Sequence, residues 1–236
     1  METGMKPKLF LSVAAGALSL AVATGPAAAQ SARDGQPGIK AGDVLLRVRA
    51  IMVAPNERSG SILPAFPGEE ARVDNSFMPE IDATYMASDH IGVELIASTT
   101  KHHADGRTGT TGSIGRLAST WVLPPTLTAQ YHFAPTSHVR PYVGAGLNYT
   151  IFWNEKASSG LEKAVGATRV HMKDSVGWAA QAGIDVDLTR RVFLNLDVKY
   201  IDIDTTARLQ TTAAGTQRVR LSLDPLVVGV GLGFKL

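Results

Sequence analysis

Residues 143–151 read Val-Gly-Ala-Gly-Leu-Asn-Tyr-Thr-Ile, a stretch in which apolar side chains alternate with glycines and small polar side chains. Because successive side chains of a β-strand point to opposite faces, this period of two predicts a strand with one apolar and one polar face. About 9–11 such residues cross a bilayer at a tilt. A soluble sheet would show the same pattern, so the stretch predicts a strand but not its surroundings.

The same alternation recurs along the chain. In its first occurrence Arg47 and Arg49 fall on the face opposite to Val48. Every second side chain of a strand in a membrane barrel faces lipid while the others face a polar interior. We therefore predict an all-β protein, an eight-stranded antiparallel up-and-down transmembrane barrel, with strands at residues 44–52, 77–86, 91–99, 126–133, 143–151, 175–186, 194–200 and 228–236.

The connections between these strands alternate in length. Short turns are predicted at residues 88–89, 134–139 and 188–191, and long connections at 55–75, 101–120, 154–173 and 205–220. Short periplasmic turns and long external loops are typical of outer-membrane barrels. Aromatic residues such as Phe77, Tyr131 and Trp153 lie near the ends of the predicted strands, as in the interface girdles of membrane proteins. Both features favour the membrane barrel over a soluble sandwich.

The beginning of the chain resembles an export signal. A basic Lys6-Pro7-Lys8 start, an apolar run over residues 9–24 and the small residues Ala27-Ala28-Ala29 predict a signal peptide at residues 1–29, cut after Ala29. A short periplasmic segment (residues 30–42) and the barrel (residues 43–236) follow. A retained N-terminal anchor is the alternative. Export and a barrel together predict the outer membrane of a Gram-negative bacterium.

Composition excludes several other classes. There is no cysteine, so an exported chain must be held together without disulfides. The net charge of +2 does not indicate a nucleic-acid partner. No spacing of residues suggests a metal site or a cofactor.

The short turns also predict which residues face each other. A turn at Ser88-Asp89 would set Asp82 opposite Glu94, and the turn after Val186 would set Gln181 opposite Asp197. The turn around Ser137 would set His132 opposite Tyr142 and Thr126 opposite Asn148. In each hairpin polar residues meet on the inner face, as the pleat of a sheet requires.

Several segments resemble the OmpW family of small outer-membrane barrels. They are Tyr85-Met86-Ala87-Ser88-Asp89-His90-Ile91-Gly92-Val93-Glu94-Leu95, residues 123–131 (LPPTLTAQY), residues 140–150 (RPYVGAGLNYT), residues 200–207 (YIDIDTTA) and residues 219–225 (VRLSLDP). The resemblance covers essentially the whole mature chain, and the LPPTL and DIDTT blocks are its most specific parts. It implies an eight-stranded barrel that helps small hydrophobic compounds cross the outer membrane, with some members linked to alkane uptake.

Two positions depart from the family's pattern. Such barrels usually end in an aromatic residue that the barrel-assembly machinery reads, whereas this chain ends in Leu236. Relatives often carry Trp after Lys-Asp-Ser, where this chain has Val176 and places Trp178 two residues later. A gating role of that Trp is therefore not carried over.

Charged residues on the predicted inner face must pair, because eight strands enclose a lumen only wide enough for side chains. We expect a polar plug in this lumen, formed by Arg47, Arg49, Glu80, Asp82 and Glu94. The alternative is a polar core that merely sets the strand register.

A plugged lumen raises the question of how a hydrophobic solute leaves. Proline removes a donor from the β-ladder, so Pro124 and Pro125 predict a weak place in the wall. We hypothesise that solutes enter between the external loops and exit sideways into the bilayer, along Ile62, Leu63, Phe66, Phe152, Pro124 and Pro125. The alternative is that these prolines only end the strand pairing.

Other functions remain open from the sequence. The predicted external loops carry many Lys and Arg residues that could contact lipopolysaccharide phosphates. A receptor or structural barrel without transport is one alternative function. A lipid-modifying enzyme is the less favoured one, because His102 and His103 near Ser98 and Asp105, and His171 near Asp174 and Ser175, form no motif. No catalytic residue is predicted.

Overall fold

A computed structural model describes residues 38–236 of the chain. The predicted signal peptide and most of the predicted periplasmic segment lie outside the described residues. None of the helices in residues 38–236 has the length and hydropathy needed to cross a membrane.

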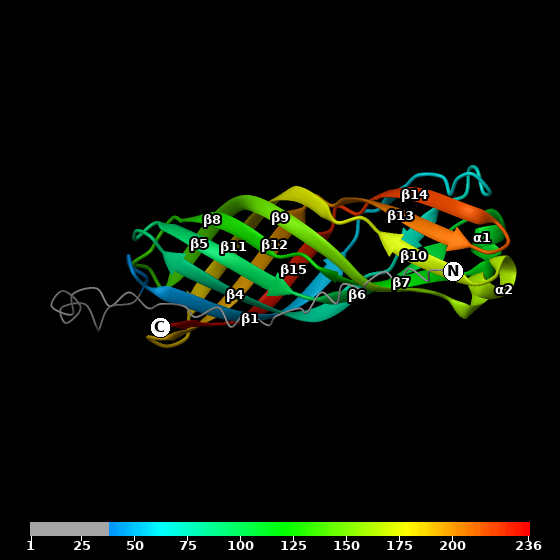
Figure 1. Cartoon of the computed structure of the whole chain (residues 1–236). Helices are drawn as coiled ribbons and strands as arrows, with labels where there is room; N and C mark the ends of the chain where they lie inside the picture. Colours follow the sequence, from blue (N-terminus) through cyan, green and yellow to red (C-terminus); the bar gives the residue numbers. More distant parts are fainter. Residues whose placement is uncertain (1–37) are drawn as a thin grey trace, which may run out of the picture. The chain divides into compact units, whose positions relative to one another are not determined.

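Eight antiparallel strands form a closed barrel (Figure 1). Neighbours in the ring are hydrogen-bonded, and the pairing of the fifth strand with the sixth closes it. Each of the eight stretches predicted from alternation coincides with one of these strands, although three of them (91–99, 126–133 and 228–236) run one residue past the strand end, so the predicted fold is confirmed. In ring order they are β1 (Val44–Ala54), β4 (Ser76–Met86), β5 (Ile91–Ser98), β8 (Thr126–His132), β9 (Val139–Ala157), β11 (Ser175–Asp187), β12 (Val192–Ile201) and β15 (Leu226–Lys235).

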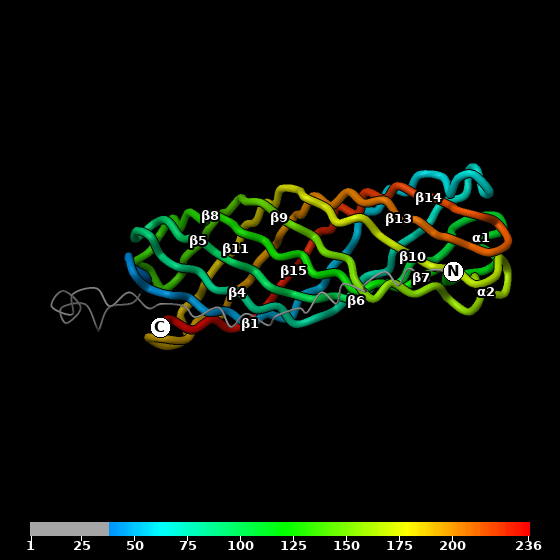
Figure 2. The backbone as a smooth tube through the Cα atoms, in the orientation of Figure 1, coloured from blue at the N-terminus to red at the C-terminus, as the bar shows by residue number. Residues whose placement is uncertain are grey.

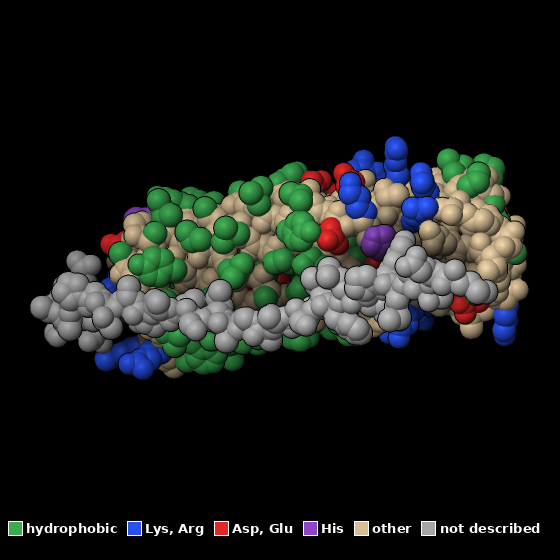
Figure 3. Space-filling view, in the orientation of Figure 1, with side chains coloured by type: hydrophobic (Ala, Val, Ile, Leu, Met, Phe, Trp, Pro, Cys, Tyr) green, Lys and Arg blue, Asp and Glu red, His purple; other side chains and the backbone are tan. Residues whose placement is uncertain are grey.

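The two faces of the barrel wall differ as the period of two predicts. Val48 and Ile81, which face each other on β1 and β4, are 45% and 53% exposed on the outside, whereas Arg47, next to Val48 in the chain, is fully buried inside. Figure 3 shows hydrophobic side chains spread over the barrel strands. A lipid-facing wall needs apolar side chains outside and polar side chains inside, the reverse of a water-soluble protein, because the surroundings of the barrel are apolar.

The predicted register is confirmed in one hairpin and wrong in two. His132 faces Tyr142 and Thr126 faces Asn148, as predicted. Glu94, however, faces Thr84 rather than Asp82, which faces Ile96. The observed pairs are symmetric about Asp89, whereas the predicted pair is symmetric about Ser88. This difference of one residue in the centre of the turn changes each cross-strand partner by two residues.

The same correction applies to the hairpin of β11 and β12. Gln181 faces Lys199, and Asp197 faces Gly183. A shift of two residues keeps every side chain on its face, so the inner and outer sets are unchanged.

The four long connections fold into further strands beyond the barrel. β6 (Thr100–Gly106), β7 (Arg116–Leu123) and β3 (Ala71–Val73) continue the barrel sheet along the end of β9, while β10 (Thr168–Met172), β13 (Asp204–Thr211), β14 (Gly215–Ser222) and β2 (Arg58–Ser59) form a second sheet. Two short helices join them, α1 (Gly109–Ile114) and α2 (Ser159–Val165). Figure 2 follows this external extension as a tube from the ends of the barrel strands. Its strands bury their own apolar faces, such as Leu209 and Val219, against a shared core.

The residues just before β1 cover the other end of the barrel. Ile39 is buried against Leu45, Met86 and Phe193. Its backbone N–H donates to the carbonyl oxygen of Pro135 at 2.7 Å. The Lys235 ammonium donates to the Gly38 carbonyl oxygen at 2.7 Å. These contacts hold residues 38–42 against the base, at the end with the short turns.

Candidate functional site

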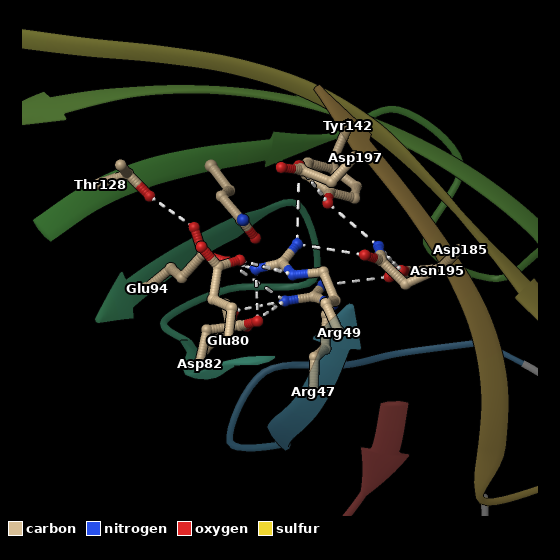
Figure 4. A network of polar contacts seen from close by, with 12 residues as sticks. Arg47, Arg49, Glu80, Asp82, Glu94, Thr128, Tyr142, Asp185, Asn195 and Asp197 are labelled. Atoms are coloured by element: carbon tan, nitrogen blue, oxygen red, sulfur yellow. Dashed lines mark hydrogen bonds and ion pairs between the residues drawn. The ribbon is translucent and has the colours of Figure 1, made fainter. Parts of the chain in front are cut away.

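The inner face of β1 places two arginines in the lumen. In the register of β1 with β4, Arg47 lies directly opposite Asp82 and Arg49 directly opposite Glu80 (Figure 4). Arg47 Nη1 lies 3.0 Å from Asp82 Oδ1, and Arg49 Nε lies 2.9 Å from Glu80 Oε1. Local strand pairing therefore creates the first two ion pairs.

Glu94 on β5 joins both arginines from the next strand. Its Oε1 atom lies 3.3 Å from Arg49 Nη2 and 3.6 Å from Arg47 Nη1. Arg49 also contacts Asp82. The structure thus brings together all five residues of the predicted polar plug, and all five are buried.

Five further residues complete this cluster from the opposite wall. Arg47 Nη2 lies 3.1 Å from Asp185 Oδ2, and Lys199 Nζ lies 2.6 Å from Glu80 Oε1. The Tyr142 hydroxyl donates to Asp197 at 2.8 Å. The period of two accounts for their place on the inner face of each strand, but it does not identify these partners. We call the ten residues the lumen network: Arg47, Arg49, Glu80, Asp82, Glu94, Tyr142, Asp185, Asn195, Asp197 and Lys199.

A glycine strand makes room for the arginines. Gly231 on β15 faces Arg49 across the ladder. A Cβ atom at position 231 would lie 2.1 Å from the Val48 carbonyl oxygen and 2.8 Å from Arg49 Cγ. A side chain there would clash with the β1 backbone and with the base of the Arg49 side chain, so glycine at position 231 is a packing requirement of the network.

Above the lumen network lies a chamber with mainly apolar walls. About 100 Å³ of it is open to the centre of a water-sized molecule. Its walls come from the upper barrel, such as Ile51 and Val227, and from the external extension, such as Val122 and Leu221. Glu80 and Lys199 of the network form part of its floor.

The predicted solute pathway falls only partly along this chamber. Ile62, Phe152 and Pro124 line it. Phe66 packs against the same apolar core. Leu63 is half exposed, and Pro125 is not part of the lining that the described residues form. Three of the six predicted pathway residues therefore meet at the chamber, and one more lies behind its wall.

The wall next to the chamber is interrupted at the predicted prolines. The ladder between β5 and β8 ends at Ile96 and Thr126, and its continuation between β6 and β7 resumes at Thr100 and Val122. Within the described chain, residues 97–99 and 123–125 form no ladder pair across this seam. Neither Pro124 nor Pro125 has an N–H to donate.

A longer interruption lies on the other side of β6 and was not predicted. The ladder of β4 with β5 ends at Glu80 and Ser98. The next backbone bond across this seam runs from the Asp74 N–H to the His103 carbonyl oxygen at 3.2 Å. Between them, residues 75–79 and 99–102 are unpaired across the seam in the described structure.

Pro79 explains part of this second gap. The Met86 N–H points to the β1 side, where it bonds the Asp43 carbonyl oxygen. The backbone N–H groups of successive strand residues point to opposite sides. Position 79 is seven residues before Met86, so its backbone nitrogen points away from β1 and towards β6. Proline has no N–H to offer there, so the backbone ladder stays unpaired at the height of Glu80 on the chamber floor.

The histidines form no recognisable catalytic group. His103 Nδ1 lies 2.9 Å from Asp74 Oδ2, while Asp105 pairs with Arg116 at 3.7 Å. Burial raises the pKa of Asp74, but hydrogen bonds from His103 outweigh it and lower the pKa overall. His171 is exposed and lies 3.7 Å from Glu155. Among residues 38–236, no three His, Cys, Asp or Glu side chains are grouped to hold a metal ion.

Comparison with known proteins places this arrangement in a family. Residues 40–236 match the OmpW family. The chain is 38% identical over 197 residues to outer membrane protein W of Escherichia coli strain K12, covering 83% of this chain and 89% of that protein. It is 26% identical to outer membrane protein AlkL of Ectopseudomonas oleovorans, covering 72% and 70% of the two chains.

The solved structures agree. The crystal structure of the outer membrane protein OprG from Pseudomonas aeruginosa superposes with a TM-score of 0.79 at 33% identity, covering 84% of this chain and 98% of that chain. The match spans both the barrel sequence and the extension. The chain belongs to the OmpW family, and it is an outer-membrane β-barrel protein.

Proposed function

We propose that this protein carries small hydrophobic compounds across the outer membrane. The observation that supports this most is a mainly apolar chamber directly above a buried, charged lumen network. An apolar solute gains from entering such a chamber, because its surface is removed from water. The route begins between the external strands, near Ile62 and Phe152.

The lumen network argues against an exit along the barrel axis. It draws side chains from six of the eight barrel strands, and its charged groups are buried. Removing one partner of a buried ion pair costs about 3–5 kcal/mol. A solute passing along the axis would have to separate several such pairs at once.

The exit we propose is therefore lateral, through the seam beside Pro124 and Pro125. Pro124 lines the chamber and borders the unpaired residues 123–125. A solute leaving there would pass directly into the hydrocarbon of the membrane. The gap between β4 and β6 at Pro79 is a second possible exit, because Ser98 and Thr100 on its edge also line the chamber.

Flux into liposomes tests both the function and the exit. Purified protein should admit a hydrophobic fluorescent reporter, and a Pro124→Val/Pro125→Val variant should slow it several-fold if the exit lies there. A Pro79→Val variant is the matched comparison on the other seam. Slower flux only with Pro79→Val would move the exit to the β4–β6 gap. Unchanged flux in both variants would rule out the lateral route.

The alternative function is a receptor or structural barrel through which nothing passes. In that case no apolar solute should enter liposomes that contain the folded protein. A lipid-modifying enzyme is the weaker alternative, since neither His102 nor His103 bonds a serine in the described residues. A His171→Ala variant that abolished lipid hydrolysis would support it.

A further inference from the structure

We propose that the chamber binds amphiphiles, with an uncharged hydroxyl head group held at its floor by Ser98 and Thr100, in preference to pure hydrocarbons. This inference rests on the proposed function, which it deepens by naming the class of solute. It comes from one wall of the chamber, where the lining is polar.

That wall is formed where β5 runs into β6. Ser98, Thr100 and His102 all line the chamber, and they are 7%, 3% and 7% exposed. Most of the remaining lining is apolar, including Ile51 on β1 and Val122 on β7. Three successive inward residues of β5 and β6 thus form a polar strip in a chamber whose lining is mainly apolar.

The hydrogen bonds of His102 show which donors and acceptors of this strip remain available to a ligand. His102 Nδ1 lies 3.0 Å from the Asp74 carbonyl oxygen, which can only accept, so Nδ1 carries the proton. His102 Nε2 then accepts from the Thr100 hydroxyl at 3.1 Å. Thr100 has used its donor, and its oxygen remains free to accept.

Ser98, two residues before Thr100 on the same face, is the second residue of the proposed head-group site. Its hydroxyl is buried and makes no hydrogen bond within the described chain. Buried hydroxyls are normally paired, because an unmade bond leaves the full desolvation penalty in place. A ligand hydroxyl at this point could accept from Ser98 and donate to Thr100, which satisfies both residues.

Ser98 also fixes the height of the head group. It lies directly opposite Glu80 in the β4–β5 register. Glu80 and Lys199, paired at 2.6 Å, form part of the floor beside it. The head group would therefore sit at the base of the chamber, with the hydrocarbon tail extending towards Phe152 and Leu221 in the upper walls.

The charges of the floor select a neutral head. The lumen network contains three cationic side chains and five carboxylates, which gives a formal charge of −2 beneath the chamber: Arg47, Arg49 and Lys199 against Glu80, Asp82, Glu94, Asp185 and Asp197. A carboxylate head would be repelled by this excess. An ammonium head would be attracted by the excess, but it would have to give up its hydration in a mainly apolar chamber beside Lys199, whose partner Glu80 is already engaged. A hydroxyl carries neither penalty.

Saturation binding to the full mature protein in phosphatidylcholine nanodiscs tests this selection. The probes are labelled dodecane, 1-dodecanol, dodecanoate and dodecylammonium, with binding to empty nanodiscs subtracted. We expect 1-dodecanol to bind about tenfold more tightly than dodecane, the combined effect of two hydrogen bonds to buried groups at the lower end of their usual strength. Both ionic probes should bind more weakly than the alcohol.

Two variants separate the head-group site from the rest of the chamber. Ser98→Ala/Thr100→Val should abolish the preference for the alcohol while leaving dodecane binding unchanged, which also shows that the chamber is intact. Thr120→Val is the matched control, because Thr120 also lines the chamber but its hydroxyl hydrogen is already shared between the Trp121 and Trp153 carbonyl oxygens. Its selectivity should match the unmodified protein.

The results distinguish this inference from the proposed function. Equal binding of alcohol and alkane, tighter binding of an ionic probe, or a preference that survives Ser98→Ala/Thr100→Val would overturn the head-group site. If any of these results is found but the protein still admits alkane to liposomes, the proposed transport function stands without the head-group site. Selective binding of the alcohol without any flux would support the site and count against transport.

Discussion

Arg49 on β1 and Glu80 on β4 lie directly opposite each other inside the barrel, with Arg49 Nε 2.9 Å from Glu80 Oε1 and both side chains buried. Arg49 also reaches Asp82, Glu94 and Asp197. A single guanidinium thus holds carboxylates from β4, β5 and β12. The lumen network depends on this residue more than on any one carboxylate.

Replacing Arg49 with Met should therefore destabilise the barrel strongly. Four buried carboxylates would lose a counter-charge, and breaking a buried pair from one side costs about 3–5 kcal/mol. The measurement is the free energy of unfolding by urea in lipid vesicles. Arg107→Met is the control, because Arg107 is exposed and pairs with Glu70 at 3.5 Å, so it should change stability by less than about 1 kcal/mol. Equal effects of the two variants would contradict a central role for Arg49.

A methyl group at position 231 should prevent correct closure of the barrel. The Cβ of Gly231→Ala would lie 2.1 Å from the Val48 carbonyl oxygen, which belongs to the backbone of β1 and cannot move aside easily. We expect the variant to lose the heat-modifiable gel shift of a folded barrel. Gly60→Ala, whose Cβ would lie 3.6 Å from the nearest atom, should fold normally. A folded Gly231→Ala protein would show that β1 and β15 can separate there.

The N-terminal cover of the barrel base should contribute to stability. Ile39 is 4% exposed among Leu45, Met86 and Phe193. Ile39→Ala should lower the free energy of unfolding by about 2–5 kcal/mol, since it leaves a cavity in a packed cluster. Leu188→Ala, at an exposed position in a short turn, is the control and should have little effect. Matching losses would mean that the cover does not pack as described.

Acidification should loosen the external extension through His102. Burial lowers the pKa of His102, although Asp74 opposes this and His103 adds to it. Because the folded pKa lies below the unfolded one, the unfolded state binds the proton more readily. The stability from neutral His102 is thus present above about pH 6.5 and is lost as pH falls towards the folded pKa.

Hydrogen exchange of β6 amides over this range measures the effect. Protection should fall as pH is lowered, after correction for the intrinsic exchange rates. A His102→Gln variant should remove the dependence, while His138→Gln, at an exposed turn position, should retain it. Dependence that survives His102→Gln would assign the effect to another group.

Two arginines on the extension should bind lipopolysaccharide phosphates. Arg208 on β13 lies directly opposite Arg218 on β14, and both are exposed. Like charges in this position repel, and a phosphate between them would relieve the repulsion. Figure 3 shows Lys and Arg side chains gathered on the extension.

Arg208→Gln/Arg218→Gln should weaken lipopolysaccharide binding by about 1 kcal/mol per arginine at low salt. Arg190→Gln/Arg191→Gln removes the same charge at the opposite, short-turn end and should leave binding unchanged. Equal losses would indicate attraction by net charge alone, and no loss in either variant would exclude the arginine pair.

The sequence by itself determined the eight strands of the barrel and the face on which each side chain lies. The alternation of Val143, Ala145 and Leu147 with Gly144 and Gly146 is local, and its period depends only on the geometry of one strand. It also determined that Arg47, Glu80 and Glu94 share the lumen, because an even shift in register leaves the faces unchanged.

Only the tertiary structure decided which lumen residues pair and where the wall lacks backbone pairing. Arg47 meets Asp185 although they are 138 positions apart in the chain. Such a contact depends on how the ring closes, and no local period encodes it. The same holds for the gap between β4 and β6, which arises because the pairing of β4 with β5 ends at Glu80 and Ser98 and resumes only at Asp74 and His103. Proline at position 79 marks the place, but only the closed barrel sets this unpaired stretch beside residues 98 and 100, which line the chamber.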